Sequence, residues 1–133
     1  MKTTRIIAAA VLIVAGALAP DVALAQWMGI KRTDLGRNDL SFPGREVIQV
    51  LVEFAPGVAA PNHAHPGEEV AYVIEGSFEY VLEGRPPVIL NPGDALFIPA
   101  GTFHAVRNVG SGKGVELATY IVEKGKPLLF PAQ

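Results

Sequence analysis

Two of the three histidines in the chain lie one residue apart, in the stretch His-Ala-His-Pro-Gly-Glu-Glu that begins at His63. Side chains two residues apart on a strand share a face, so His63 and His65 point the same way and Glu69 keeps their parity. Glu68 has the opposite parity and is the weaker candidate. The third histidine, His104, begins another predicted strand, which in a closed barrel can face the first. Imidazole nitrogens beside a carboxylate oxygen are typical ligands of a divalent transition metal.

This donor set suits Mn, Fe, Ni, Cu or Zn, and the identity of the metal stays open. The chain has no cysteine, which excludes thiolate ligands and a cysteine nucleophile. In six-fold coordination, four protein ligands would leave two positions open, as a catalytic or ligand-binding site requires.

Two other interpretations of these residues remain on local pattern alone. One is a closed four-coordinate zinc site that only stabilises the fold, and the other is a set of ordinary core or surface histidines.

The elements that must position these residues are predicted to be strands. Short runs rich in Val, Ile, Phe, Tyr and Leu alternate with Gly- and Pro-containing turns, and no stretch has a sustained 3.6-residue apolar period. The predicted strands are 47–54, 70–75, 78–83, 88–90, 96–98, 104–108 and 116–122. Residues 26–46 show little pattern and are expected to form an irregular arm, with or without a short edge strand. The tail, 123–133, is expected to be extended. The chain is therefore predicted to be all-β, a sandwich or small barrel.

The first 25 residues are interpreted as a cleaved signal peptide rather than as part of the fold. A basic start is followed by an apolar run that ends at Pro20, and Ala23-Leu24-Ala25 fits a cleavage site before Gln26. An uncleaved N-terminal anchor is the alternative. The protein is expected to be exported, to the periplasm if the source is a Gram-negative bacterium and otherwise to the medium.

A net charge of −2 argues against nucleic acid or an anionic membrane as a partner of the protein.

Two longer motifs contain the candidate ligands. In the first, Gly57 is followed after five residues by His63-x-His65, after three more by Glu69 and after six more by Gly76. In the second, Gly93 is followed after five residues by Pro99-x-Gly101, after two more by His104 and after three more by Asn108. These motifs resemble, at every position, the two motifs of the cupin superfamily, in the spacing of its small single-domain members. Matching so many fixed positions is far more specific than a lone glycine pattern.

The resemblance implies a double-stranded β-helix, or jelly-roll barrel, as a single domain over 26–133 with its core in 45–122. It implies that His63, His65, Glu69 and His104 hold one divalent metal inside the barrel. Cupins with this ligand set include dioxygenases, oxalate-degrading enzymes and isomerases. We therefore expect a metal-dependent enzyme, such as a dioxygenase, acting on a small oxygen-chelating substrate. The alternative is a non-catalytic metal- or small-molecule-binding module. Cupins commonly pair through their sheets, so a homodimer is expected.

Few other residues are candidates for chemistry. Glu69 is the one convincing acid or base, if it is not always bound to the metal. Arg107 has the opposite parity to His104 and is expected to face outward, and Asn108 is interpreted as structural. Several apolar side chains are candidates to line a pocket, although residues of this kind more often belong to the barrel core: Tyr72, Phe78, Tyr80, Phe97, Phe103 and Val106.

Overall fold

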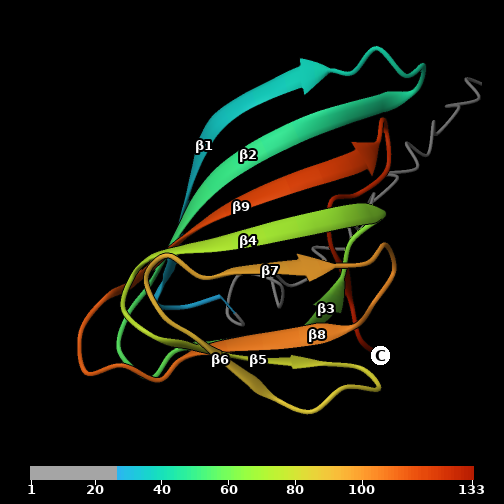
Figure 1. Ribbon diagram of the computed structural model, residues 1–133. Coiled ribbons are helices and arrows are strands. Elements are labelled where there is room, and N and C mark those ends of the chain that lie inside the picture. Colours follow the sequence, from blue (N-terminus) through green and yellow to red (C-terminus); the bar gives the residue numbers. More distant parts are fainter. Residues whose placement is uncertain (1–26) are drawn as a thin grey trace, which may run out of the picture.

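The computed structural model describes residues 27–133, and this part of the chain consists of strands and connecting loops (Figure 1). The predicted signal peptide, residues 1–25, lies outside the described residues, and so does the expected cleavage before Gln26. Among residues 27–133 the structure has no helix long and apolar enough to cross a membrane.

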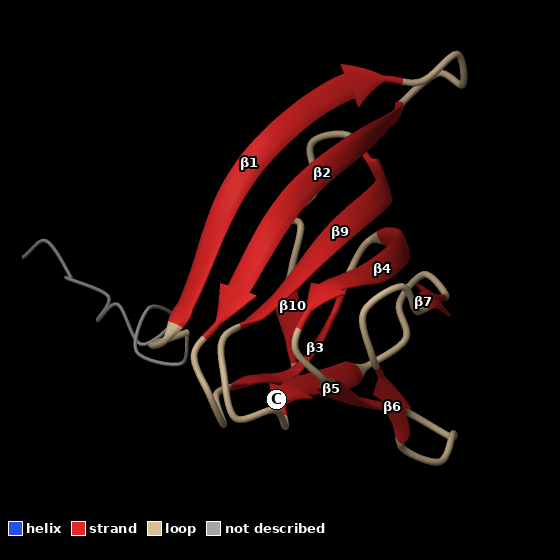
Figure 2. Cartoon of the chain, turned by 60° about the vertical axis from the view of Figure 1, so that its left-hand side comes forward, coloured by secondary structure: helices blue, strands red, loops and turns tan. Residues whose placement is uncertain are grey.

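The strands form two antiparallel sheets that pack as two layers (Figures 1 and 2). One sheet has the order β1-β2-β9-β4-β7, and the other has the order β10-β3-β8-β5-β6. The predicted all-β fold is confirmed, and each predicted strand is present within three residues of its expected bounds. The strands are β1 (Ile30–Asp39), β2 (Arg45–Phe54), β3 (Ala59–Ala64), β4 (Gly67–Glu75), β5 (Phe78–Leu82), β6 (Val88–Leu90), β7 (Ala95–Ile98), β8 (His104–Asn108), β9 (Gly114–Glu123) and β10 (Phe130–Pro131).

The core lies between the two sheets because the inward positions of the strands are apolar. On β2, Ile48, Val50, Val52 and Phe54 are buried and alternate with outward residues such as Gln49. The apolar face of this strand is therefore its inward face. Burying each such side chain contributes about 1.5–3 kcal/mol to folding. This dry interior also surrounds the histidines.

The expectation of an irregular arm at residues 26–46 is wrong for residues 30–39, where the edge strand that was left open is present and is long. Residues 30–39 form the ten-residue strand β1, which lies at the edge of its sheet and pairs only with β2. Most of its side chains are exposed, so it needs no alternation of apolar and polar residues. Main-chain hydrogen bonds to β2 hold it instead. The tail, expected to be extended, turns at residues 124–125 and ends in the short strand Phe130–Pro131, which pairs with β3.

Asn108 joins three segments at one end of the barrel. Its side chain is fully buried, and its Nδ2 donates to the carbonyls of Phe54 at 3.2 Å, Ala55 at 3.3 Å and Gly112 at 2.8 Å. Its Oδ1 accepts from the backbone N–H of Gly110 at 2.9 Å. These bonds satisfy main-chain groups that leave the strands at this end. The structural role predicted for Asn108 is confirmed.

Replacement of this amide should destabilise the fold strongly. The change Asn108→Ala leaves buried carbonyls and one N–H without partners, and we expect a loss of about 3 kcal/mol in the free energy of unfolding. Urea denaturation followed by circular dichroism measures this loss. Asn62→Ala, at an exposed position, is the control and should change stability little. A loss at Asn108 no larger than that of the control would contradict the role.

Candidate metal centre

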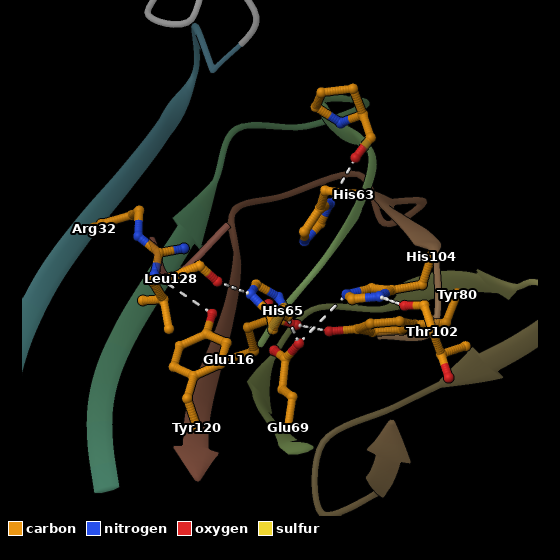
Figure 3. Close-up of polar contacts among 11 residues, drawn as sticks. Arg32, His63, His65, Glu69, Tyr80, Thr102, His104, Glu116, Tyr120 and Leu128 are labelled. Carbon is orange, nitrogen blue, oxygen red and sulfur yellow. Dashed lines mark hydrogen bonds and ion pairs between the residues drawn. The ribbon is translucent and has the colours of Figure 1, made fainter. Parts of the chain in front are cut away.

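His63 and His104 come from neighbouring strands of one sheet, His65 comes from the link between the two sheets, and Glu69 comes from the other sheet. His63 on β3 is directly paired with His104 at the start of β8. These two strands are therefore neighbours in one sheet, which corrects the expectation that they face each other across the barrel. His65 lies in the link between β3 and β4, and Glu69 points inward from β4 (Figure 3). The fold thus brings all four predicted ligands together.

The potential ligand atoms converge on one point inside the protein. One ring nitrogen from each of the three histidines lies within 4.8 Å of the others. The carboxylate oxygen Oε2 of Glu69 lies 3.1 Å from Nε2 of His65 and 3.3 Å from Nε2 of His104. All four side chains are buried, with at most 5% of each residue exposed. A group of this kind could hold one metal ion.

Backbone carbonyls fix the orientation of each imidazole. Nδ1 of His63 lies 2.6 Å from the carbonyl oxygen of Pro61, and Nδ1 of His104 lies 3.0 Å from that of Thr102. Nδ1 of His65 lies 2.6 Å from the carbonyl oxygen of Leu128, near the C-terminal strand β10. A carbonyl can only accept, so each Nδ1 donates a proton. In the neutral ring, Nε2 then presents its lone pair to the shared point, as a metal ligand must.

Two buried polar atoms at this point have no hydrogen-bond partner, namely Nε2 of His65 and Oε2 of Glu69. A nitrogen lone pair and a carboxylate oxygen only 3.1 Å apart repel each other unless positive charge lies close to both. A divalent cation supplies that charge and accepts both donors. The residues present therefore fit a transition metal with nitrogen and oxygen ligands.

The protonation states in the site also suit metal ligands. Burial by itself would raise the pKa of Glu69. Hydrogen bonds from His104 and His65, which require a proton on Nε2 in place of a metal, outweigh burial and hold this pKa at about 2 in the metal-free protein. Burial, together with repulsion from His104, lowers the pKa of His63 to about 4. At neutral pH, Glu69 is therefore anionic and His63 is neutral, the forms that bind a cation.

A small cavity of about 10 Å³ adjoins this group, which is about the room that one water molecule or ion needs. Its walls include Trp27 and Arg32 from the N-terminal part of the described chain, as well as Tyr80, Glu116 and Tyr120. The ring of Trp27 packs edge-on against His63, with centroids 5.5 Å apart. The ring of Tyr120 lies against His65, with centroids 4.7 Å apart. Aromatic rings thus limit how far these two imidazoles can move.

A second carboxyl group, Glu116, faces the same cavity from β9 and accepts a hydrogen bond from the Tyr80 hydroxyl (Figure 3). Glu116 is only 3% exposed, and burial raises its pKa to about 8 in spite of this hydrogen bond. Burial also raises the pKa values of Tyr80 and Tyr120 above the usual value for tyrosine. The cavity wall opposite the ligands therefore holds exchangeable protons at neutral pH.

Only some of the predicted pocket residues lie at this cavity. Tyr80 and Val106 line it, whereas Phe78 belongs to the core. Tyr72 and Phe97 are exposed on the outer face of their sheet, and Phe103 lines surface grooves. Arg107 pairs with Glu79 at 3.2 Å on the exposed surface, as its parity predicted.

Four residues at the cavity were not identified from the sequence: Trp27, Arg32, Glu116 and Tyr120. Trp27 and Arg32 lie in the segment expected to be irregular, so no face could be assigned to them. Glu116 and Tyr120 lie on a predicted strand and share one parity. An acid on the apolar face of that strand was the signal that could have revealed Glu116.

The chain belongs to the cupin family. A model of the family, described as a cupin domain, matches residues 50–122, more than half of the chain. This match includes all four candidate ligands, and it agrees with the two-layered antiparallel fold. The jelly-roll fold predicted from the two motifs is confirmed.

Known relatives differ in activity. The chain is 38% identical over 66 residues to the dimethylsulfoniopropionate lyase DddQ of Ruegeria pomeroyi, a match that covers 50% of the chain and 33% of DddQ. The solved DddQ structure superposes with a TM-score of 0.64 at 26% identity, covering 77% of the chain and 51% of DddQ.

The pectin degradation protein KdgF of Dickeya dadantii is 35% identical over 85 residues, covering 63% of the chain and 71% of KdgF. The cupin-domain-containing oxidoreductase fogC of Aspergillus ruber is 35% identical over 88 residues, covering 59% of the chain and 42% of fogC. The matches thus cover between 33% and 51% of DddQ and 42% of fogC, and these names do not select one reaction for the chain.

Removal of single ligands should distinguish Glu69 from its neighbour. We expect His63→Ala to abolish tight binding of Co²⁺ or Zn²⁺, and Glu69→Gln to weaken binding at least about tenfold. Glu68→Gln removes the same charge from a side chain of opposite parity and should leave the affinity unchanged. Isothermal titration measures binding, and circular dichroism should show that each variant keeps its β content. A collapse of His63→Ala would indicate a structural metal, and equal affinities for the two glutamate variants would remove Glu69 from the ligand set.

The raised pKa of Glu116 predicts a specific dependence of stability on pH. A carboxyl whose pKa is higher in the folded state stabilises the fold fully below its unfolded value of 4.5, and this stability is lost as the pH rises towards 8. Glutamine does not ionise, so Glu116→Gln should become more stable relative to the native protein between pH 4.5 and 8, by roughly 4 kcal/mol.

Urea denaturation of the metal-free proteins at several pH values, with chelator present, tests this expectation. Glu83→Gln, at an exposed position, controls for the loss of one carboxyl group. A stability difference between Glu116→Gln and the native protein that stays constant from pH 5 to 8 would mean that Glu116 is ionised in the folded protein.

Proposed function

We propose that this cupin is a metal-dependent enzyme that acts on a small organic substrate able to chelate the metal through oxygen atoms. The observation that supports this most directly is the convergence of three buried imidazoles and one carboxylate, in which Nε2 of His65 and Oε2 of Glu69 have no hydrogen-bond partner. One divalent transition metal, among Fe, Mn, Ni, Cu and Zn, would be held by His63, His65, His104 and Glu69. When bound, it supplies a Lewis acid and, if redox-active, a route for electrons.

The residues around the metal would orient the substrate, exclude water and exchange protons. Trp27 and Tyr120 cover two of the imidazoles and keep the site dry. Glu69 was the first candidate for an acid or base, but a pKa of about 2 suits a ligand better than a base. Glu116, with a pKa of about 8 and Tyr80 as its hydrogen-bond donor, is better suited to hold or release a proton near pH 7.

Two reaction classes fit these residues. The first is a dioxygenase-like oxidation, which is supported by the nitrogen-rich ligand set and by the similarity to an oxidoreductase cupin. The second is a proton transfer of the kind that lyases and isomerases perform, and Glu116 is the specific observation in its favour. The two classes differ in their need for molecular oxygen.

Oxygen dependence can therefore identify the reaction class. The protein is loaded separately with each candidate metal and offered flavonols, catechols, diketones and oxalate, in air and under nitrogen. We expect turnover in at least one combination, and His104→Ala should abolish it whereas Glu68→Gln should not. Uptake of oxygen would identify an oxidation, and product formation under nitrogen would identify a proton transfer.

Absence of turnover in every combination would favour a non-catalytic binding module. Azide then separates the remaining alternatives, because it can perturb the spectrum of a bound metal only where a coordination position is open. A metal spectrum that azide leaves unchanged would indicate a closed structural site.

Export and dimer formation remain proposals. Export rests on residues 1–25 and would place metal loading outside the cytoplasm. Dimer formation is supported by the outer face of the first sheet, where Tyr72, Phe97 and Ile121 are at least 37% exposed. Such an apolar patch is typical of a surface that a partner covers.

A further inference from the structure

Arg32 is directed to the cavity by its register on β1. It pairs with Val52, which faces the core, so Arg32 lies on the inner face of the sheet. Its neighbour Lys31 pairs with Glu53 on the outer face, where the two form an ion pair at 3.1 Å. Adjacent cations on one edge strand therefore have different surroundings. Only Arg32 of these two lines the cavity beside the histidines.

The guanidinium of Arg32 has few partners in the described part of the chain. Its one hydrogen bond there runs from Nη2 to the hydroxyl of Tyr120 at 3.4 Å, and its carbon Cζ lies 5.8 Å from the centroid of the Tyr120 ring (Figure 3). No carboxylate of residues 27–133 lies within ion-pair distance of it. A guanidinium carries five N–H donors in a planar fork that matches a carboxylate. Most of these donors are therefore available to a ligand.

The charge of the cavity also favours an anion. Glu69 cancels one of the two charges of a bound divalent ion, and Arg32 adds a further positive charge at the cavity wall. Glu116 is the other carboxyl group at the cavity wall. Even with Glu116 ionised, the charges of a divalent ion, Glu69, Arg32 and Glu116 sum to a positive value. In surroundings of low dielectric constant, such an excess strongly favours a negatively charged ligand.

We propose that Arg32 is the substrate-binding residue of this site and that the substrate is a small organic dianion. One oxygen-bearing group would lie at the metal, and a carboxylate further along the molecule would accept hydrogen bonds from the guanidinium. This inference rests on the function proposed above. The free volume beside the histidines has room for about one water molecule or ion. The ligand would therefore enter it with one oxygen atom, and the rest would extend past the exposed side chain of Arg32 towards solvent.

Binding of simple carboxylates to the Co²⁺-loaded protein tests this proposal without knowledge of the substrate. Azide tests whether the metal has an open coordination position, and acetate tests binding of a single carboxylate. Oxalate, malonate and succinate add a second carboxylate at increasing distance from the first. We expect the native protein to bind at least one of these dicarboxylates more tightly than acetate. Arg32→Gln should weaken that binding between about tenfold and a hundredfold and weaken azide binding much less, because azide loses only the nearby charge and no hydrogen bonds to a second carboxylate.

Two further variants test how Arg32 acts. Lys31→Gln removes the same charge from the outer face of β1 and should change none of these affinities. Arg32→Lys keeps the charge but loses the planar fork, and it should restore binding only in part. Equal Co²⁺ affinity in all the variants would show that the site is intact in each of them.

The outcomes separate this inference from the proposed function. If Co²⁺ and azide bind but no dicarboxylate is preferred over acetate, or if Arg32→Gln binds dicarboxylates as well as the native protein does, the role of Arg32 is overturned and the metal centre stands. If the native protein does not bind Co²⁺, both proposals fail together.

Discussion

The hydrogen bonds from the imidazole Nδ1 atoms to backbone carbonyls are the interactions on which the site depends. Each donates the one proton of a neutral ring to a carbonyl of Pro61, Thr102 or Leu128. This leaves the Nε2 lone pairs directed at a common point, next to the Glu69 carboxylate. Burial makes that arrangement costly, because lone pairs and a negative charge face one another away from water. The rest of the barrel holds this costly arrangement in place and shields it.

The two sheets divide this work. The pairing of β3 with β8 sets His63 beside His104, and the packing of one layer on the other brings Glu69 towards them. Register also sorts the charges at the edge of the molecule, since Lys31 and Arg32 are adjacent in sequence but lie on opposite faces. A shift of β1 by one residue would exchange them. The chemistry of the cavity therefore depends on strand register as much as on the ligands themselves.

Much of the fold and the group of candidate ligands could be predicted, because the sequence features that indicate them lie in short stretches of the chain. Alternation on β2, turn residues and two spaced motifs were enough to predict the strands and to bring His63, His65, Glu69 and His104 together. The prediction failed at β1, because an edge strand with exposed side chains is held by its main chain and leaves no apolar pattern. Arg32 and Trp27 were missed for that reason. His63 and His104 were correctly predicted to belong to one site, but they were expected to face each other across the barrel. They lie on neighbouring strands of one sheet, because sequence spacing does not give strand order.

The bond from His65 to the carbonyl of Leu128 has a consequence for biosynthesis. The two residues are 63 positions apart, and the acceptor belongs to a segment that follows the last long strand. A nascent polypeptide that has emerged only to the end of β9 already contains every candidate ligand side chain. It still lacks the carbonyl of Leu128, which fixes the orientation of the His65 ring. Metal capture with full affinity must therefore await the emergence and docking of that final segment, which disfavours tight binding to a half-made molecule.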